Sequence, residues 1–369
     1  MKVLHIYKDY YPILGGIENH VGMLARGQAE RGLEVTVLVT HPGRGADDTR
    51  VDGVRLIRVR RLMTTASTPL SVSLFAQVAR LSPDITHLHF PYPVGELAHL
   101  LLGRSRKTVI TYHSDIVRQR TMLRFYRPLL WQVLRRADRI LATSPQYIVS
   151  SPFLSRFAAK CTVVPLGVPL GRFDQPDSSE VASLRAKSAG PVLLFVGRLR
   201  YYKGLHYLMD ALDVVNATLW VVGSGPMETD WRAYAASLPW NERIVFWGEV
   251  SDKLLPAYYH ACDVFVLPAC ERSEAFGAVQ IEAMAAGKPV VCTELGTGTS
   301  FVNQHGVTGF VVPPRDPAAL AEAINCLLSD ESLRRRMGEA GRVRARAEFS
   351  EEVMVERVIE VYRTVLTGS

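Results

Sequence analysis

The sequence predicts two α/β domains in series, each built on a doubly wound parallel sheet with helices on both faces. Short runs rich in Val, Ile and Leu alternate with longer stretches of helical period, which is typical of parallel sheets covered by helices. The alternation breaks at residues 165–190 and restarts at 192–196. The length of 369 residues also fits two domains, at ~150 residues per domain. We therefore expect one domain over residues 1–170 and a second over 171–349, facing each other across a central cleft.

The first domain is expected to alternate strands and helices along its whole length. Apolar runs predict strands at 2–7, 34–40, 54–59, 84–89, 107–112, 139–142 and 161–164. Helical periodicity predicts helices at 17–31, 70–81, 93–102, 120–137 and 145–150.

Proline, glycine and polar residues mark the break between the domains. Pro165–Pro169 precedes a polar stretch, Asp174–Ser179, with the composition of an interdomain linker. Strands are then expected at 192–196, 218–222, 243–247, 263–267, 289–292 and 309–312. From about residue 316 the chain is expected to be helical, because Asp316-Pro317 is a helix-start signal.

The composition excludes several classes of protein. Hydrophobic residues make up 48% and charged residues 21%, which is the balance of a folded globular chain and not of a disordered one. No run approaches the ~18 apolar residues that span a bilayer, and the first residues resemble a strand more than a signal peptide. The five cysteines are scattered and contain no C-x-x-C pair, so neither a disulfide framework nor a zinc knuckle is indicated. We expect a cytoplasmic protein.

The charge is unevenly distributed. Residues 1–170 hold 23 lysines and arginines against 11 acids, whereas the remainder holds 20 against 25. This asymmetry indicates an anionic partner that meets mainly the first half. Within the densest stretch, 104–139, arginines mix with aromatic and apolar side chains at loosely helical spacing, interrupted by Pro128. The candidate membrane-facing residues are Arg118, Arg120, Arg124, Arg127 and Trp131.

Such a surface suits an anionic bilayer, with the rings at headgroup depth. The alternative is a solvated helix that covers the sheet. A nucleic-acid partner is disfavoured, because the sequence contains no recognised nucleic-acid-binding module.

Two glycine-containing turns follow the first strand of each domain. Gly15-Gly16 stands at the start of a helix, where backbone N–H groups and the helix dipole favour an anion; a simple tight turn is the alternative. Gly197-Arg198 is followed by Lys203-Gly204. Since doubly wound sheets bind ligands beyond the carboxyl ends of their strands, both cations are expected to face a diphosphate there. The alternative for them is a pair of solvated surface charges.

The most specific segment is the pair Glu274 and Glu282, separated by seven residues. A helix over its second half is expected to end at Gly287. Eight helical residues advance ~12 Å at most, which is roughly the span of a diphosphate. One carboxylate would then accept hydrogen bonds from sugar hydroxyls and the other from ribose hydroxyls. Two acids on an exposed helix are the alternative, which the surrounding apolar residues disfavour.

Together these motifs resemble the family-four retaining glycosyltransferases of the GT-B fold. The resemblance rests on Gly15-Gly16, His113, Gly197-Arg198 with Lys203-Gly204, the turn Gly223–Pro226 and the E-x7-E segment, in this order. It covers nearly the whole chain. It implies two Rossmann-like domains, the first for the acceptor and the second for a nucleotide-sugar donor. It also implies that residues from about 350 to 369 pack back on the first domain.

The resemblance further implies the role of each site residue. Arg198 and Lys203 would hold the donor pyrophosphate, with help from the amide of Gly16. Glu274 would contact the transferred sugar, Glu282 the ribose, and His113 would lie beside the reacting sugar. The implied catalytic residues are His113, Arg198, Lys203 and Glu274. The implied donor-binding residues are Gly15, Gly16, Gly197, Arg198, Lys203, Val250, Glu274, Ala275, Phe276, Gly277 and Glu282.

The loop Thr293–Asn303 resembles the version found in bacterial O-antigen and capsule mannosyl- and rhamnosyltransferases that use GDP-sugars. Its Gly and Thr groups are candidate donors to phosphate or sugar oxygens. This likeness suggests a mannose-type donor, with GDP-mannose as the candidate, and a lipid-linked saccharide acceptor in cell-surface polysaccharide synthesis. Such an enzyme would be peripheral on the inner leaflet of the cytoplasmic membrane.

No cofactor is expected. The sequence contains no Asp-x-Asp, the usual carboxylate pair for a catalytic divalent metal, so Arg198 and Lys203 would neutralise the diphosphate instead. His87-x-His89 is a weak candidate for a metal site, against ordinary packing or a contact with the acceptor.

Three functions remain open from the sequence. The first is a retaining, metal-independent glycosyltransferase. The second is a nucleotide-sugar epimerase or phosphorylase on the same fold, which acceptor-independent conversion of the donor would reveal. The third is a non-catalytic nucleotide-sugar-binding subunit, which transfer by the chain alone would exclude.

Overall fold

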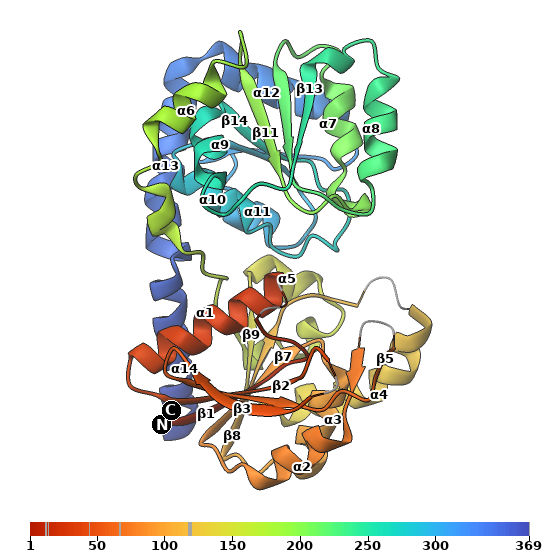
Figure 1. The fold of residues 1–369 in the computed structure, drawn as a ribbon, viewed down its shortest axis with the longest axis vertical. Helices are drawn as coiled ribbons and strands as arrows, with labels where there is room; N and C mark the ends of the chain where they lie inside the picture. The colour runs from red at the N-terminus through yellow and green to blue at the C-terminus, as the bar shows by residue number, and fades with distance from the viewer. Residues whose placement is uncertain (12, 14, 44, 66–67, 117–119, 369) are drawn as a thin grey trace. The chain divides into compact units, whose positions relative to one another are not determined.

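The protein folds into two units, which the computed structural model describes for residues 1–11, 13, 15–43, 45–65, 68–116 and 120–368, the side chains of 120–123 excepted. The first unit comprises Met1–Gly167 and Glu351–Ser369, and the second Val168–Ser350. Figure 1 shows the blue helix α14 (Glu351–Thr367) running beside the red helix α1 (Gly16–Glu30) of the first unit. The expected boundaries at 170 and 349 lie within three residues of this division.

The first unit contains an eight-stranded sheet in the order β10-β9-β8-β7-β1-β2-β4-β3. Its strands are β1 (Lys2–Ile6), β2 (Glu34–Thr40), β3 (Asp47–Val51), β4 (Val54–Val59), β7 (Ile85–Phe90), β8 (Lys107–Tyr112), β9 (Arg139–Ala142) and β10 (Cys161–Val163). All neighbouring strands pair in parallel except β3, which is antiparallel to β4 at the edge. The order reverses between β1 and β7, so this is the switch point of the sheet.

Helices cover both faces of this sheet. They are α1, α2 (Val72–Arg80), α3 (Pro93–Leu102), α4 (Arg120–Arg136), α5 (Pro145–Ser150), the 3-10 helix η1 (Leu154–Lys160) and α14. Helix α14 contributes Val358, Ile359 and Tyr362 to the core, and a Cβ on Gly27 of α1 would lie 2.7 Å from Val355. The two helices therefore pack closely because Gly27 has no side chain. Pro128 lies inside α4, which continues through it rather than being interrupted there.

The second unit contains a six-stranded parallel sheet in the order β13-β12-β11-β14-β15-β16. Its strands are β11 (Val192–Val196), β12 (Thr218–Val222), β13 (Ile244–Gly248), β14 (Val264–Leu267), β15 (Val290–Thr293) and β16 (Gly309–Val312). Counted from β11, this is the strand order 3-2-1-4-5-6 of dinucleotide-binding folds. Its switch point lies between β11 and β14. The predicted doubly wound fold class is confirmed.

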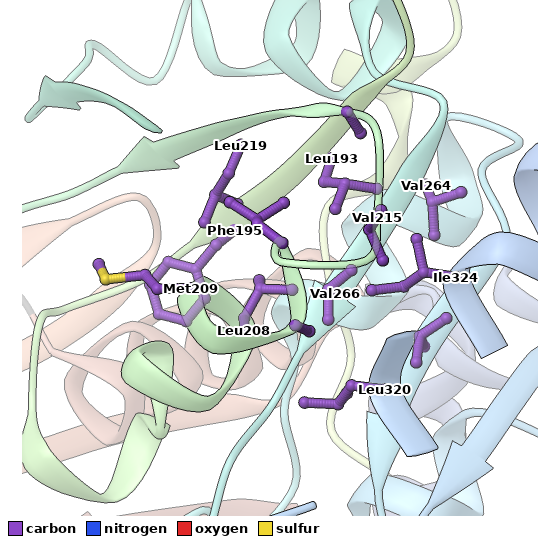
Figure 2. Packing of buried hydrophobic residues seen from close by; sticks show 14 of the residues in the cluster. Leu193, Phe195, Leu208, Met209, Val215, Leu219, Val264, Val266, Leu320 and Ile324 are labelled. Carbon is purple, nitrogen blue, oxygen red and sulfur yellow. The ribbon is translucent and has the colours of Figure 1, made fainter. Parts of the chain in front are cut away.

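The helices of the second unit complete its core. They are η2 (Leu170–Phe173), α6 (Ser178–Arg185), η3 (Tyr201–Lys203), α7 (Leu205–Ala211), α8 (Glu228–Ala236), η4 (Asn241–Arg243), α9 (Leu255–Ala261), α10 (Val279–Ala285), α11 (Thr299–Val302), α12 (Pro317–Ser329) and α13 (Glu331–Phe349). Figure 2 shows Leu193 and Phe195 of β11 packing with side chains of α7 and α12. As expected, α12 begins at Asp316-Pro317, where the Asp316 side chain accepts a hydrogen bond from Ala319 N at 2.9 Å.

The expected interdomain linker differs from the structure. Residues 174–190 belong to the second unit, where Asp177 caps α6 through the amides of Ser179 and Glu180. The chain instead crosses between the units at Gly167–Val168 and again at Ser350–Glu351. Residues beside the two crossings are hydrogen-bonded to each other, since Val168 N donates to Phe349 O at 2.9 Å.

In the part of the chain that the structure describes, no helix combines the length and the apolar character needed to cross a bilayer.

Candidate functional site

The carboxyl ends of β11 and β14 flank the switch point of the second unit. Crevices at such points bind ligands in doubly wound sheets, because the loops on either side separate there. Gly197 and Arg198 directly follow β11, and the loop after β14 leads to Glu274. The fold therefore brings the two motifs predicted from the sequence to one edge of one sheet.

Glycines let the turns after β11 and β12 pack backbone to backbone. Gly223 has φ +119°, and a Cβ there would lie 2.3 Å from Gly197 O. A Cβ on Gly225 would lie 2.6 Å from Leu199 N and O, and Leu199 N donates to Ser224 O at 2.8 Å. The turn that carries Arg198 is therefore fixed by its neighbour.

Lys203 is placed by a second close approach. Gly204 adopts the left-handed conformation at φ +64°, and a Cβ there would lie 2.3 Å from Pro268 O, just after β14. Cys270 N donates to Tyr202 O at 2.8 Å, which ties η3 to the same loop. These contacts aim the Lys203 side chain at the segment that contains Glu274.

Lys203 and Glu274 form a short ion pair. Lys203 Nζ lies 2.6 Å from Glu274 Oε2, and the side chains are only 9% and 10% exposed. The angles at this contact are not those of a hydrogen bond, so Glu274 Oε2 has no hydrogen-bond partner among the described residues. Arg198, by contrast, is exposed, and among those residues its guanidinium has neither a hydrogen bond nor an ion pair. The site thus holds one paired and one unpaired cation.

The loop Thr293–Asn303 is hydrogen-bonded to the segment that contains Glu274. Thr297 Oγ1 donates to Glu274 O at 2.8 Å, and Gly298 N donates to Ala275 O at 2.8 Å. Thr299 Oγ1 donates to Thr293 O at 3.0 Å. These three candidate donors to a ligand, the hydroxyls of Thr297 and Thr299 and the amide of Gly298, therefore already donate to the protein backbone.

The other implied donor-binding residues near this segment and after β13 differ in burial and backbone conformation. Phe276 is buried, with its ring 6.2 Å from that of Phe349. Gly277 has φ +75°, and a Cβ there would lie 2.6 Å from Gln280 Nε2. Ala275 is half-buried before them, and Val250 is half-buried after β13. Helix α10 begins at Val279, so Glu274 lies in the loop before the helix and Glu282 within it.

Glu282 has two protein partners. Arg172 Nη2 donates to Oε1 at 2.6 Å, and Tyr259 OH donates to Oε2 at 2.7 Å. Burial raises the pKa of the Glu282 carboxyl, while the Arg172 charge opposes that rise. No sequence pattern pointed to Arg172 or Tyr259, which lie 110 and 23 residues away. Each carboxylate oxygen keeps a lone pair for one further donor.

Replacing Glu282 by alanine is expected to weaken donor binding by roughly 10- to 100-fold, the range for a hydrogen bond to a charged group. Turnover at saturating donor should fall much less, because Glu282 is expected to contact the ribose and not the reacting carbon. Nucleotide titration and steady-state kinetics measure the two effects separately. Tyr259→Phe is the matched control, since it removes one of the same hydrogen bonds but keeps the carboxylate. Lost turnover with unchanged donor affinity would contradict the assignment.

In the first unit, Gly15 and Gly16 stand where α1 begins. Gly15 is the N-cap in an extended conformation, with no side-chain hydrogen bond to the first turn. Nothing lies within 4 Å of a Cβ built on Gly16, so its backbone faces open space. Glu18 in this turn lies 3.8 Å from Lys8 Nζ.

His113 belongs to a cluster of five buried histidines from β1, α1, β7 and the end of β8: His5, His20, His87, His89 and His113. Burial lowers the pKa of His5 to about 4 and that of His20 to about 3, and it lowers the pKa of the other three well below the usual value. All five imidazoles are therefore neutral at pH 7. The five histidines are spread over more than a hundred residues, so the sequence patterns indicated only His87, His89 and His113 and not the cluster.

Hydrogen bonds occupy the ring nitrogens of His87 and His89, the candidate metal site. His87 uses both ring nitrogens, toward Tyr362 OH at 2.5 Å and Thr111 Oγ1 at 2.6 Å. His89 also uses both, toward His5 at 3.0 Å and His113 at 3.2 Å. A metal there would have to displace these partners.

Helix α4 carries part of the expected membrane surface. Arg124 and Arg127 are exposed, and Phe125 between them is 81% exposed. Arg118 lies outside the described residues, and so does the side chain of Arg120. Trp131 differs from the expectation. It is half-buried, with its ring 5.7 Å from Phe153 and 5.5 Å from Phe157, so it packs inward.

Two doubly wound parallel-sheet units in one chain are the architecture of GT-B glycosyltransferases. Residues 14–172 match the model of Glycosyltransferase Family 4, and residues 178–344 match that of Glycosyl transferases group 1. The chain belongs to this glycosyltransferase family, so it is a glycosyltransferase and not an epimerase, a phosphorylase or a non-catalytic subunit.

Relatives of known name cover the whole chain. The O-antigen chain mannosyltransferase C of Escherichia coli is 38% identical over 370 residues, 99% of each chain. The D-rhamnosyltransferase WbpZ of Pseudomonas aeruginosa is 37% identical over 95% of this chain and 92% of its own. Among solved structures, the sucrose-phosphate synthase of Thermosynechococcus elongatus has the same fold, with a TM-score of 0.78 at 24% identity over 100% of both chains.

Proposed function

We propose that this enzyme moves a hexose from a nucleotide-diphosphate donor to a lipid-linked saccharide in bacterial cell-surface polysaccharide synthesis. The observation that carries the donor class is the arrangement of Lys203, Glu274 and Arg198 at the switch point. A diphosphate needs fixed positive charge, and a sugar needs hydrogen-bond acceptors. This site offers both within one loop cluster.

The donor would bind by exchanging partners. Its phosphates compete with Glu274 for the Lys203 ammonium and recruit Arg198, which has no partner of its own among the described residues. Glu274 is then free to accept hydrogen bonds from the transferred sugar. The ion pair thus keeps both groups aligned before the donor arrives, which lowers the reorganisation needed at the moment of reaction.

Transfer exchanges one bond for another at the anomeric carbon. The bond from that carbon to the β-phosphate oxygen breaks, and a bond to the acceptor oxygen forms, with retention of configuration. Lys203 and Arg198 stabilise the negative charge that develops on the diphosphate as this bond breaks, and the acceptor's proton then passes to the leaving phosphate oxygen. The family resemblance assigns His113 to the reacting sugar and the backbone of Gly16 to the pyrophosphate.

A mannose-type sugar is the proposed hexose, with GDP-mannose as the candidate donor. The names of the two relatives, a mannosyltransferase and a D-rhamnosyltransferase, support a hexose of this type and an O-antigen-like acceptor.

Thermal stabilisation by a nucleotide panel tests the donor. A ligand that binds only the folded form raises its apparent stability by about 2.7 kcal/mol at 100 times its Kd. We expect GDP and GDP-mannose to stabilise the protein more than UDP or ADP, and EDTA to leave both binding and transfer intact. Stabilisation by UDP alone would contradict the base assignment. Loss of transfer with EDTA, restored by a divalent cation, would contradict the metal-free account.

We also propose that α4 rests on an anionic membrane surface, where the lipid-linked acceptor is found. Support comes from Arg124 and Arg127, which flank the exposed ring of Phe125, and from the excess of basic residues in the first half of the chain.

Replacing Arg124 and Arg127 by serine is expected to lower binding to vesicles containing anionic lipid. Each cation near such a surface contributes about 1 kcal/mol, so the double variant should bind roughly 10- to 30-fold more weakly. Flotation with phosphatidylglycerol vesicles measures this. Arg335→Ser with Arg336→Ser removes the same charge from exposed positions on α13 and should have little effect. Equal binding of both variants would leave α4 as a solvated helix.

A further inference from the structure

An unbroken hydrogen-bonded chain runs through the interior of the first unit from His113 to Thr111. In order, it joins His113, His89, His5, Gln28, Tyr362, His87 and Thr111. The elements that supply it, β1, α1, β7, β8 and α14, all belong to this unit (Figure 1). Gln28 and Tyr362 are fully buried. No proposed step of the transfer explains why so many polar side chains are buried together.

Each histidine in this chain is neutral, because burial holds its pKa far below 7. A neutral imidazole has one N–H, which donates, and one bare nitrogen, which accepts. Two imidazoles in contact must therefore point the same way along the chain. Once the protonated ring nitrogen of one histidine is known, the protonated nitrogen of every other histidine in the chain follows.

Gln28 supplies the fixed point. Its carbonyl Oε1 lies 2.8 Å from His5 Nε2, and a carbonyl can only accept, so His5 carries its proton on Nε2. His5 Nδ1 is then bare and accepts from His89 Nε2 at 3.0 Å. His89 Nδ1 is bare in turn and accepts from His113 Nε2 at 3.2 Å. The proton of His113 therefore lies on Nε2, and its Nδ1 is a bare acceptor with no protein partner among the described residues.

The other half of the chain holds the Gln28 amide in this orientation. Gln28 Nε2 donates to Tyr362 OH at 3.3 Å, and Tyr362 OH donates to His87 Nδ1 at 2.5 Å. His87 then donates from Nε2 to Thr111 Oγ1 at 2.6 Å. Turning the amide over would invert every donor and acceptor on both sides. The orientation of one side chain thus decides the polarity of the whole chain.

We propose that Gln28 is a positioning residue that fixes His113 as a hydrogen-bond acceptor at Nδ1, so that it takes a hydrogen bond from a hydroxyl of the reacting sugar. This rests on the proposed place of His113 beside that sugar. A sugar hydroxyl can donate this hydrogen bond, whereas a group that only accepts cannot.

Nitrogen NMR of the full-length protein, labelled with ¹⁵N-histidine, tests the polarity without any activity measurement. Protonated and bare ring nitrogens have well-separated shifts, and the His113 signals are assigned by their loss in His113→Gln. We expect a bare Nδ1 and a protonated Nε2 at pH 7. A proton on Nδ1 of His113 would overturn the proposal, whatever the enzyme transfers.

Three variants test the role of the amide. Gln28→Leu removes the fixed point, and Tyr362→Phe removes only the hydroxyl that holds the amide, so either should give mixed tautomers at His113. Both variants should lower kcat/KM roughly tenfold, which is the loss expected when one hydrogen bond to the transition state is no longer made. Gln28→Glu keeps an acceptor toward His5 and should restore both the tautomer and most of the activity. Tyr362→Phe, which preserves core volume, decides the matter if Gln28→Leu does not fold.

The outcomes separate this inference from the proposed function. Mixed tautomers in both variants with unchanged kcat/KM would show that the hydrogen-bond polarity at His113 does not serve transfer. That result would overturn the proposed role of Gln28. Failure to transfer a hexose from any nucleotide donor would instead contradict the proposed function, and the NMR result would stand by itself.

Discussion

Lys203→Ala is expected to reduce transfer by roughly 10²- to 10³-fold, the loss typical when one fixed group that stabilises developing charge is removed. Lys203 is the buried cation at the switch point, and its ammonium lies 2.6 Å from Glu274. Without it, the exposed Arg198 is the remaining side-chain cation assigned to the leaving diphosphate. Glu274→Ala should have an effect of similar size, because the acceptor for the sugar hydroxyls is lost. Single-turnover assays at saturating donor measure both.

Stability measurements keep this result interpretable. Breaking a deeply buried ion pair costs about 3–5 kcal/mol, and this pair is not fully buried, so the second unit should stay folded. Urea melts of Lys203→Ala and of the double variant with Glu274→Ala report the cost, which should be smaller in the double variant because no charge is left unpaired. Lys253→Ala removes an exposed lysine of the same unit and should leave transfer unchanged. Near-normal turnover in Lys203→Ala would remove the basis of the proposed donor site.

Removing the chain after Ser350 is expected to unfold the first unit while the second keeps its structure. Seven side chains of α14 are buried in the core of the first unit: Met354, Val355, Val358, Ile359, Val361, Tyr362 and Val365. At about 1.5–3 kcal/mol for each large apolar side chain, their loss is comparable with the whole stability of a domain, about 5–15 kcal/mol. Hydrogen exchange measured by mass spectrometry should show fast exchange in β1, β7 and β8 and protection in β11 and β14.

A shorter truncation is the matched control. Ending the chain after Leu366 removes only exposed residues of those the structure describes and should leave both units protected. Retained protection of β1 and β7 after removal of all of α14 would contradict the packing described here.

The sequence predicted the sheets well because parallel strands buried on both faces are nearly continuous apolar runs. All six residues of β7 are buried, for example, and the run is plain in the sequence. It missed β3, whose residues Asp47–Val51 are mostly polar and exposed, and the hairpin of β5 (Met63–Thr65) and β6 (Thr68–Leu70). β3 lies at the edge of its sheet, and β5 and β6 form a separate two-stranded sheet. These segments bury little, so no apolar pattern marks them.

The site shows the same division. Lys203 and Glu274 follow strands, so the topology rule places them at one sheet edge without any knowledge of their contact. The partners of Glu282 and the hydrogen bonds of Thr297 depend on how distant loops meet, and no spacing in the sequence encodes that. The tautomers of the four hydrogen-bonded histidines depend further on one buried amide, Gln28, which looks like an ordinary polar residue of a helix.

The division of the first unit into two chain segments sets an order on protein synthesis. The ribosome releases residues 168–350 as one continuous piece, which can close its core while translation goes on. Residues 1–167 emerge earlier but lack α14, so Ile85 and Val109 stay uncovered until residue 365 has been made. Nascent chains usually fold from the N-terminus, and here the later unit is complete first. The early segment is therefore where a chaperone has the longest time to bind.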